Sequence, residues 1–379
     1  MIRTGIDNLA SVHEVLAGKR LGLMTNPTGV SADLRSTIDI LNERYQLTAL
    51  FACEHGVRGD VQAGAHIASM PDPETGVMVY SVYGKTHHLS EEMLDSFDVF
   101  VFDMQDVGAR FYTYLYSLSF AMEDCAKAGK TVVVLDRPNP QGGLTVSGTL
   151  LDERVHSFVG EYAMPTRYGL TIGEYALWIR DYLKLDLELH VAKMTGWRRD
   201  MTYEETGLSF VPPSPNCATL HAARIYIGTC IFEGTNISEG RGTVLPFEYV
   251  GAPYIDAPEL ERRMNALEIP GVRFRRAYFT PQFSKHQGKQ CCGVQVHVTD
   301  EKCADTFAAG LYLLETIRQM HGDQLVWTGI EDAEYKTIDK LLGTDDYRLG
   351  RLNAAQLIEA NREKIAAWQE MSRRYWLYD

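Results

Sequence analysis

The first half of the chain alternates two hydrophobic patterns. Short runs rich in Val, Leu and Phe are separated by longer stretches in which apolar residues recur every three to four positions. The runs predict strands covered on both faces, and the stretches predict amphipathic helices. Strands are expected at 20–25, 46–52, 98–102, 131–135 and 187–191, and helices at 32–45, 110–128 and 171–182. This order predicts an α/β fold with a doubly wound sheet over residues 1–200.

The pattern changes beyond residue 200. A proline-rich segment, residues 212–216, restricts the backbone to extended conformations. Further on, 293–298 alternates as a strand, and 304–320 and 354–370 have helical periodicity. Residues 201–379 are therefore expected to form a smaller, mixed α+β domain, with an active-site cleft between the two domains.

Polar residues follow the ends of three successive predicted strands. They are Glu54, His55 and Arg58 after the second strand, Asp103, Gln105, Asp106, Arg110 and Tyr112 after the third, and Asp136, Arg137 and Asn139 after the fourth. Ligands of doubly wound sheets bind at this edge, where the strand order reverses. Asp and Asn also cap helices or pair as surface charges, but the three sets together favour a small-molecule cleft. Glu54 stands out because Glu is a poor N-cap.

A second polar segment, residues 232–243, interleaves Glu233, Asn236, Glu239 and Arg241 with three glycines that let the backbone turn tightly. The alternative interpretation is a surface turn with an incidental Glu239–Arg241 ion pair. The segment lacks the GxxxxGK[ST] pattern of a phosphate loop, and GxGxxG does not follow the first strand. HExxH is absent and the histidines lack metal-ligand spacing. Neither a nucleotide cofactor nor a metal is therefore expected.

These residue types favour carboxylate chemistry on a sugar. Glycoside hydrolysis generally uses two carboxyl groups whose surroundings set their pKa values apart. Glu54 at a buried strand end and Glu239 beside Arg241 would provide that contrast. The tyrosine-rich stretch 111–116 adds aromatic surface, and a helix over 110–128 would place Tyr112 and Tyr116 side by side.

Composition narrows the class of protein further. The 379 residues include 37 Lys and Arg against 50 Asp and Glu, a net charge of −13, which disfavours nucleic acid and a polybasic membrane contact. No apolar run reaches the roughly 18 residues of a membrane span. A signal-peptide pattern is absent, so the chain is expected to be cytoplasmic, or periplasmic or secreted if a leader has been removed. The seven cysteines contain no CxxC pair and are expected to be reduced thiols.

A set of ordered motifs covers the chain nearly end to end. They are 4–7 (TGID), 22–30 (GLMTNPTGV), 54–59 (EHGVRG), 80–84 (YSVYG), 103–114, 136–140 (DRPNP), 158–160 (FVG), 213–216 (PSPN), 233–243, 246–248 (PFE), 279–281 (FTP) and 284–285 (SK). Together they resemble a bacterial family, first described as a domain of unknown function, of peptidoglycan exo-β-N-acetylmuramidases.

The resemblance implies a Rossmann-like N-terminal domain, a smaller C-terminal domain and a cleft between them. It implies release of N-acetylmuramic acid from the non-reducing ends of peptidoglycan fragments, without a nucleotide cofactor. Glu54 is then catalytic, and Glu239 and Glu233 both fit the second carboxyl group. The other candidates would bind the sugar, Asn216 among them, with Arg58, Arg110, Arg137 and Arg241 available to its lactyl carboxylate. Two alternatives are a non-catalytic muropeptide-binding protein of the same fold and a nucleotide-dependent α/β enzyme.

Overall fold

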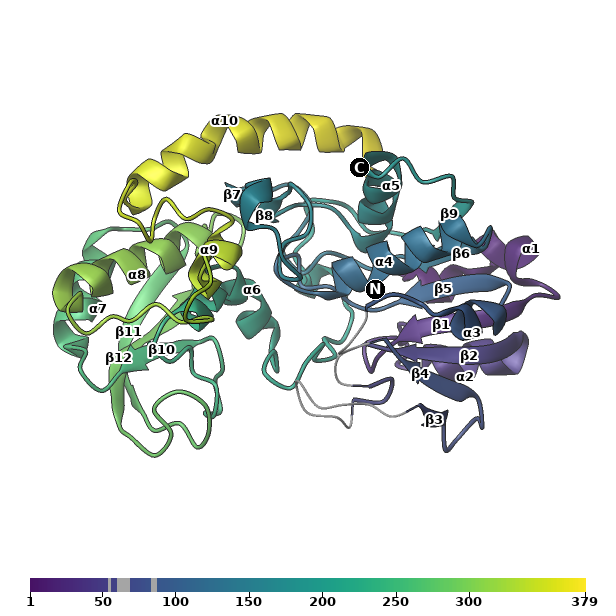
Figure 1. Ribbon diagram of the computed structural model, residues 1–379, viewed down its shortest axis with the longest axis horizontal. Coiled ribbons are helices and arrows are strands. Elements are labelled where there is room, and N and C mark those ends of the chain that lie inside the picture. The colour runs from purple at the N-terminus through teal and green to yellow at the C-terminus, as the bar shows by residue number, and fades with distance from the viewer. Residues whose placement is uncertain (54–55, 60–68, 83–86) are drawn as a thin grey trace.

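The computed structural model describes residues 1–53, 56–59, 69–82 and 87–379. A large sheet built by the first half of the chain and a smaller sheet built by the second lie at opposite ends of the molecule, and a long helix near the C-terminus bridges the two ends (Figure 1). Glu54 and His55 fall outside the described residues.

In the described part of the chain, the large sheet has seven strands in the order β3-β4-β2-β1-β5-β6-β9. All neighbours are parallel except the antiparallel pair β3–β4. The strands are β1 (Arg20–Thr25), β2 (Gln46–Ala52), β3 (Met70–Pro71), β4 (Met78–Ser81), β5 (Val99–Asp103), β6 (Thr131–Leu135) and β9 (Leu189–Ala192). Strands β2, β3 and β4 lie on one side of β1, and the chain then forms β5, β6 and β9 on the other side of β1. The strand order therefore reverses between β1 and β5.

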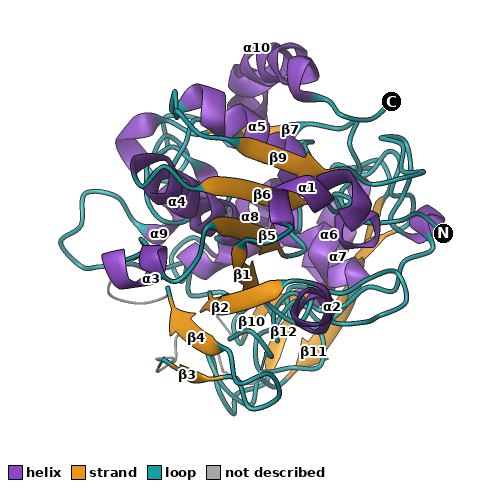
Figure 2. Ribbon diagram, turned by 90° about the vertical axis from the view of Figure 1, so that its right-hand side faces the viewer, coloured by secondary structure: helices purple, strands orange, loops and turns teal. Residues whose placement is uncertain are grey.

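Continuous apolar runs form these strands because both faces of the sheet are covered. In β5, Phe100 and Phe102 enter one hydrophobic cluster, and Val99 and Val101 enter the cluster on the opposite face. Figure 2 shows helices on both sides of the sheet. They are η1 (Gly5–Val12), α1 (His13–Leu16) and α2 (Thr37–Arg44) toward one face and α3 (Glu91–Asp95), α4 (Tyr114–Lys127) and α5 (Ile172–Tyr182) toward the other.

The second half of the chain contributes an antiparallel sheet in the order β10-β12-β11. The helices and strands of this half of the chain are α6 (Leu220–Thr229), η4 (Cys230–Gly234), β10 (Tyr249–Ala252), α7 (Ala257–Ala266), β11 (Val272–Phe279), β12 (Cys291–Val298), α8 (Thr306–His321), α9 (Thr337–Leu342), α10 (Ala354–Ser372) and η5 (Arg373–Tyr375). A hairpin of β7 (Ser147–Leu150) and β8 (Pro165–Arg167) and the short turns η2 (Glu153–Val155) and η3 (Glu204–Thr206) complete the fold.

The prediction of an α/β fold with a doubly wound sheet and a smaller mixed domain is confirmed. Two predicted helices begin too early. The helix expected at 32–45 begins at Thr37, because Val30 and Ser36 form a bridge and the Ser36 hydroxyl caps the helix. The helix expected at 110–128 begins at Tyr114, because Ala109 and Arg110 bond to the β8 strand. Tyr112 therefore precedes the helix, and its expected i,i+4 pairing with Tyr116 was wrong.

The hydrophobic cluster on the α4 side of the sheet continues into the second half, through residues such as Ile227, Phe232 and Leu311. Helix α10 crosses this junction, and its Trp368 indole donates to the Tyr168 carbonyl at 3.0 Å and packs edge-on against Trp178. The division near residue 200 stays a prediction. Within the described ranges, no helix combines the length and the apolar character that a bilayer crossing requires.

Candidate active site

The point where the strand order reverses is occupied by a buried ion pair. Asp103, the last residue of β5, accepts from Arg137 Nε at 2.5 Å and Nη2 at 2.8 Å. The Thr37 hydroxyl donates to the same carboxylate, and Thr25 Oγ1 donates to the Asp103 carbonyl at 2.7 Å. Asp103 is 0% and Arg137 5% exposed. These two candidates neutralise each other inside the protein.

Asp136 and Asn139, which follow β6, are also held by internal hydrogen bonds. The Asp136 carboxylate accepts from Thr171 Oγ1 at 2.8 Å and the Gly173 amide at 2.8 Å, and from Tyr378 Oη at 2.5 Å. Burial raises the pKa of Asp136 to about 7, against the lowering effect of these donors. Asn139 donates to the Leu170 carbonyl at 2.8 Å. Both side chains connect β6 to later segments of the chain.

Three of the candidates after β5, namely Gln105, Asp106 and Arg110, are buried and bond to other parts of the protein. Gln105 donates to the carbonyls of Asp106 and Pro138, each at 2.8 Å. Asp106 accepts from the Tyr168 hydroxyl and from the Gly108 amide, and burial raises its pKa to about 6. Arg110 is fully buried and donates to three backbone carbonyls, those of Thr149, Met164 and Leu341.

Two further candidates lie away from these groups. Arg58 pairs with Asp72 at 2.8 Å and with Glu74 at 3.1 Å. The Asn236 amide is bonded to the backbone of Gln324 and Val326. Their proposed contacts with a ligand stay predictions, as do those of the strand-end candidates.

A cavity of about 260 Å³ brings together four other candidates: Tyr112, Asn216, Glu233 and Arg241. The described residues of its wall are Phe111, Tyr112, Thr113, Tyr114, Phe158, Val159, Ser214, Asn216, Cys217, Tyr226, Cys230, Glu233, Arg241, Phe247 and Leu341. Aromatic and apolar groups thus surround a few polar ones, as is typical of small-molecule sites.

Each polar group reaches this cavity from a different segment. Tyr112 lies in the loop before α4, and the proline-rich segment that carries Asn216 is tied to that helix by Tyr114 Oη, which donates to the Pro213 carbonyl at 2.6 Å. Glu233 lies on η4, directly after α6. Arg241 lies between Gly240 and Gly242, whose φ values of 82° and 81° suit glycine. The glycines let the loop fold back so that Arg241 reaches Glu233.

Two carboxylates and two cations form a cluster at one end of the cavity. Arg241 Nη2 lies 2.6 Å from Glu233 Oε1, and Arg241 Nε lies 3.4 Å from Glu239 Oε1. Glu239 also accepts from Lys285 Nζ at 2.8 Å. With all four groups ionised, the cluster has no net charge.

The two glutamates have different surroundings. Glu239 has a side chain 2% exposed between Arg241 and Lys285, whereas the Glu233 side chain is 30% exposed and faces the cavity. Burial raises the pKa of Glu233, although the Arg241 charge opposes the rise. Glu233 therefore has a carboxyl group open to the cavity, whereas Glu239 is enclosed by two cations; the pKa contrast expected between Glu54 and Glu239 stays a prediction, because Glu54 lies outside the described residues.

Sequence reasoning missed several residues of this region. Lys285 donates to Glu239 and to the carbonyls of Phe232 and Ile237. These three bonds hold the polar segment 232–243 in place. Two glutamates with one arginine in a single segment were a signal that a further cation was required. Tyr226 and Phe247 stand edge to face with ring centres 4.7 Å apart, and the Arg241 guanidinium lies 5.1 Å from the Phe247 ring. No sequence pattern pointed to these rings.

The Tyr112 hydroxyl is buried in the cavity wall, where Ser214 and Tyr114 are its polar neighbours, but neither is aligned well enough to form a full hydrogen bond with it. A buried hydroxyl without a partner costs free energy unless a ligand or water satisfies it. Its position therefore suits a bound molecule with hydroxyl or amide groups.

The molecule is thus an α/β protein with a small-molecule cavity whose candidate reactive groups are carboxyl groups. Two family models divide the chain between them, "Exo-beta-N-acetylmuramidase NamZ, N-terminal" over residues 21–221 and "Exo-beta-N-acetylmuramidase NamZ, C-terminal" over residues 224–378. The chain belongs to this NamZ family. It is 45% identical over 383 residues to the peptidoglycan beta-N-acetylmuramidase NamZ of Bacillus subtilis (strain 168), covering 100% of this chain and 91% of that protein.

Two solved structures share the fold. A DUF1343 family protein from Bacteroides fragilis NCTC 9343 matches with a TM-score of 0.89 and 36% identity, covering 100% of this chain and 99% of that one. A second DUF1343 family protein from the same strain matches with a TM-score of 0.77 and 27% identity, with the same coverage. The family resemblance predicted from the motifs is confirmed.

Proposed function

We propose that this protein is an exo-β-N-acetylmuramidase that releases N-acetylmuramic acid from the non-reducing ends of peptidoglycan fragments in the cavity of Tyr112, Asn216, Glu233 and Arg241. The identity to the Bacillus subtilis enzyme supports the reaction class. The observation that carries the location is the Glu233–Arg241 pair, which exposes a carboxyl group of raised pKa to an aromatic cavity.

Arg241 recognises the lactyl carboxylate of the sugar. Among the described residues of the cavity wall, Arg241 is the one with a positive charge. Its guanidinium is already oriented by Glu239 and by the Phe247 ring. A substrate carboxylate competes with Glu233 for Arg241, because both are anions that accept from the same donors. Binding of substrate therefore weakens the ion pair of Glu233 and raises its pKa further.

Glu233 then acts as the general acid that protonates the leaving oxygen. The second carboxyl group is Glu54, the residue that the family resemblance implies, acting as base or nucleophile. Glu239 is a positioning residue in this mechanism, because it is enclosed by Lys285 and Arg241 and is not part of the cavity wall. Tyr112 and Asn216 supply hydrogen bonds to the sugar.

The test is hydrolysis of an N-acetylmuramyl–N-acetylglucosamine disaccharide by the Glu233→Gln variant. Loss of a general acid is expected to lower kcat by about 10²–10⁴-fold with little change in stability. Glu259→Gln is the matched control, because Glu259 pairs with Arg262 and Arg263 on the exposed face of α7. Activity of Glu233→Gln within tenfold of wild type would contradict the assignment of Glu233. Binding of the disaccharide by wild type without release would instead favour the non-catalytic alternative.

A further inference from the structure

Four arginines are buried in the described part of the chain: Arg110, Arg137, Arg167 and Arg199. A buried guanidinium requires partners for its charge and for its five N–H donors. Arg137 has the Asp103 carboxylate, and Arg199 has Glu174 at 2.6 Å together with two backbone carbonyls. Arg110 has its three carbonyls. Arg110 and Arg167 both have a buried Nε without a partner among the described residues, but Arg167 forms fewer hydrogen bonds than any of the other three.

Arg167 is the last residue of β8, and its side chain is poorly satisfied. One hydrogen bond is formed, from Nη2 to the Gln141 carbonyl, and the buried Nε has no partner among the described residues. No described carboxylate forms an ion pair with this guanidinium, although Arg167 is only 6% exposed. Burial lowers the pKa of Arg167 to about 10, so the group stays charged at neutral pH.

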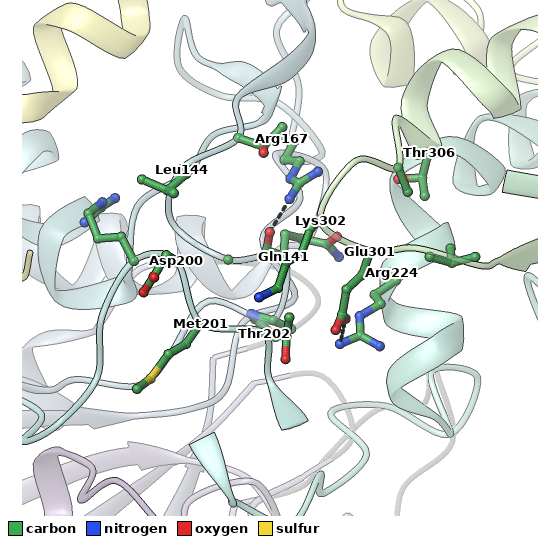
Figure 3. Close-up of a pocket in the computed structure, with 16 residues that line it drawn as sticks. Gln141, Leu144, Arg167, Asp200, Met201, Thr202, Arg224, Glu301, Lys302 and Thr306 are labelled. Atoms are coloured by element: carbon green, nitrogen blue, oxygen red, sulfur yellow. Dashed lines mark hydrogen bonds and ion pairs between the residues drawn. The ribbon is translucent and has the colours of Figure 1, made fainter. Parts of the chain in front are cut away.

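A cavity of about 360 Å³ adjoins this side chain. Figure 3 shows the guanidinium directed from its strand into the space enclosed by Gln141, Thr202, Arg224 and Glu301. The cavity and the candidate active site lie on different sides of α6, because Arg224 lines the first and Tyr226 lines the second. Two positions correspond to about 200° around a helix.

The other charges of this cavity are already matched. Arg224 pairs with both Glu204 and Glu301, and Lys302 pairs with Glu205 at 3.2 Å. Asp200 pairs with Arg198 at 3.1 Å. Arg167 thus has no ion pair among the described residues, although the Asp305 carboxylate acts on it at longer range, and it is more buried than Arg224, Lys302 and Asp200.

We propose that this cavity binds a small hydroxylated monocarboxylate, with its carboxylate against the open edge of the Arg167 guanidinium. The planar donor fork of arginine matches the two oxygens of a carboxylate. The other ionised side chains named in this wall already have ion-pair partners, so Arg167 leaves a single positive charge to match, as a monocarboxylate does and a dianion such as phosphate does not. Thr145, Thr202 and Thr306 line the remaining wall, and their hydroxyls suit the hydroxyls of a ligand. The volume falls in the range of about 300–1,000 Å³ of small-molecule sites.

The test compares D-gluconate with D-glucitol, a matched probe pair of similar size of which only gluconate is charged. Isothermal titration calorimetry on the whole chain is expected to show binding of gluconate and at least tenfold weaker binding of glucitol and of inorganic phosphate. Arg167→Met is expected to weaken gluconate binding at least tenfold. Arg241→Met, in the candidate active site, is expected to leave it unchanged.

Leu144→Trp is a second variant that does not depend on the buried arginine. Leu144 is exposed at the mouth of the cavity, so a larger side chain there blocks entry without disturbing the core. It is expected to abolish gluconate binding in a chain of wild-type stability. Equal affinity for gluconate and glucitol, tighter binding of phosphate, retention of binding in Leu144→Trp, or its loss in Arg241→Met would each overturn the assignment. The last result would place the ligand in the candidate active site and would leave the proposed hydrolysis untouched.

Discussion

Two of the arginine–carboxylate pairs in this molecule, one at the edge of the large sheet and one at the cavity, differ in what surrounds them. Asp103 and Arg137, at the carboxyl edge of the large sheet, are 0% and 5% exposed, and other donors and acceptors of the protein complete their hydrogen bonds. Glu233 and Arg241 are 30% and 28% exposed and adjoin a cavity lined by aromatic rings. The first pair connects strands to one another, whereas the second is accessible to a ligand.

The comparison shows that the density of polar residues does not locate a site. The edge of the sheet has more candidates than the cavity does, but most of their polar atoms bond to backbone or to one another. At the cavity, Glu233 keeps an accessible carboxyl group, whereas the candidates at the sheet edge are buried. What separates the two regions is access to a ligand, since unpartnered polar atoms occur in both.

The largest expected effect on stability comes from breaking the pair at the sheet edge. Arg137→Met leaves Asp103 as a buried, uncompensated charge, which is expected to lower the free energy of unfolding by about 3–5 kcal/mol. Urea denaturation followed by circular dichroism measures this change. Arg20→Met is the matched control, since Arg20 pairs with Asp98 at the exposed opposite end of β5, where loss of a pair costs about 0–1 kcal/mol. Equal losses of unfolding free energy in the two variants would show that the buried Asp103–Arg137 pair stabilises the protein no more than the exposed Arg20–Asp98 pair does.

The next largest effect is on the pH dependence of the free energy of unfolding, to which the buried Asp136 at the edge of the large sheet contributes. Burial raises the pKa of Asp136 to about 7, above the unfolded value near 3.8, so the folded state retains a proton that the unfolded state releases between those pH values. The free energy of unfolding therefore falls as pH rises from 4 to 7, on the order of a few kcal/mol from this group. Asp136→Asn is expected to flatten this part of the profile, measured by urea denaturation at several pH values. An unchanged slope would show that Asp136 is ionised in the folded protein throughout this range.

The smallest effect distinguishes two tyrosine hydroxyls. Tyr168→Phe removes a donor to the buried Asp106 and is expected to cost about 1–3 kcal/mol of stability. Tyr112→Phe removes a hydroxyl that forms no well-aligned bond to its neighbours Ser214 and Tyr114, so stability is expected to change by less than about 0.5 kcal/mol. If this hydroxyl bonds the sugar, KM rises about 3- to 10-fold, the equivalent of one hydrogen bond. A Tyr112→Phe variant as destabilised as Tyr168→Phe would mean that both hydroxyls serve the fold.

The sequence predicted the large sheet well, because each of its central strands is a continuous apolar run between two covered faces. The prediction for 131–135 coincides with β6, and that for 98–102 differs from β5 by one residue at each end. Strand β11 was missed because adjacent Arg275 and Arg276 interrupt its alternation. Helix α6 was missed because it is buried on most sides and has no polar stripe.

The candidate site was predictable where its chemistry is local. The segment 232–243 carries both Glu233 and Arg241, and the glycines around Arg241 pointed to a turn. Lys285 and Tyr226 come from distant segments, and their part in the region follows from tertiary packing. The strand-end candidates illustrate the opposite case, since hydrogen bonds such as Asp136 to Tyr378 join residues 242 positions apart and leave no local pattern.

The carboxyl edge of the large sheet is completed by residues far along the chain. The Leu377 amide donates to Glu174, Tyr378 Oη donates to Asp136, and the Asp379 carbonyl accepts from the Arg199 amide at 2.8 Å. At about 5–20 residues per second, a ribosome needs roughly 10–40 seconds to pass from β9 to these residues. During that interval the nascent sheet carries buried carboxyl groups without their final donors. A stalled or truncated translation product that lacks residues 376–379 is therefore expected to be a preferred substrate for chaperones and proteases.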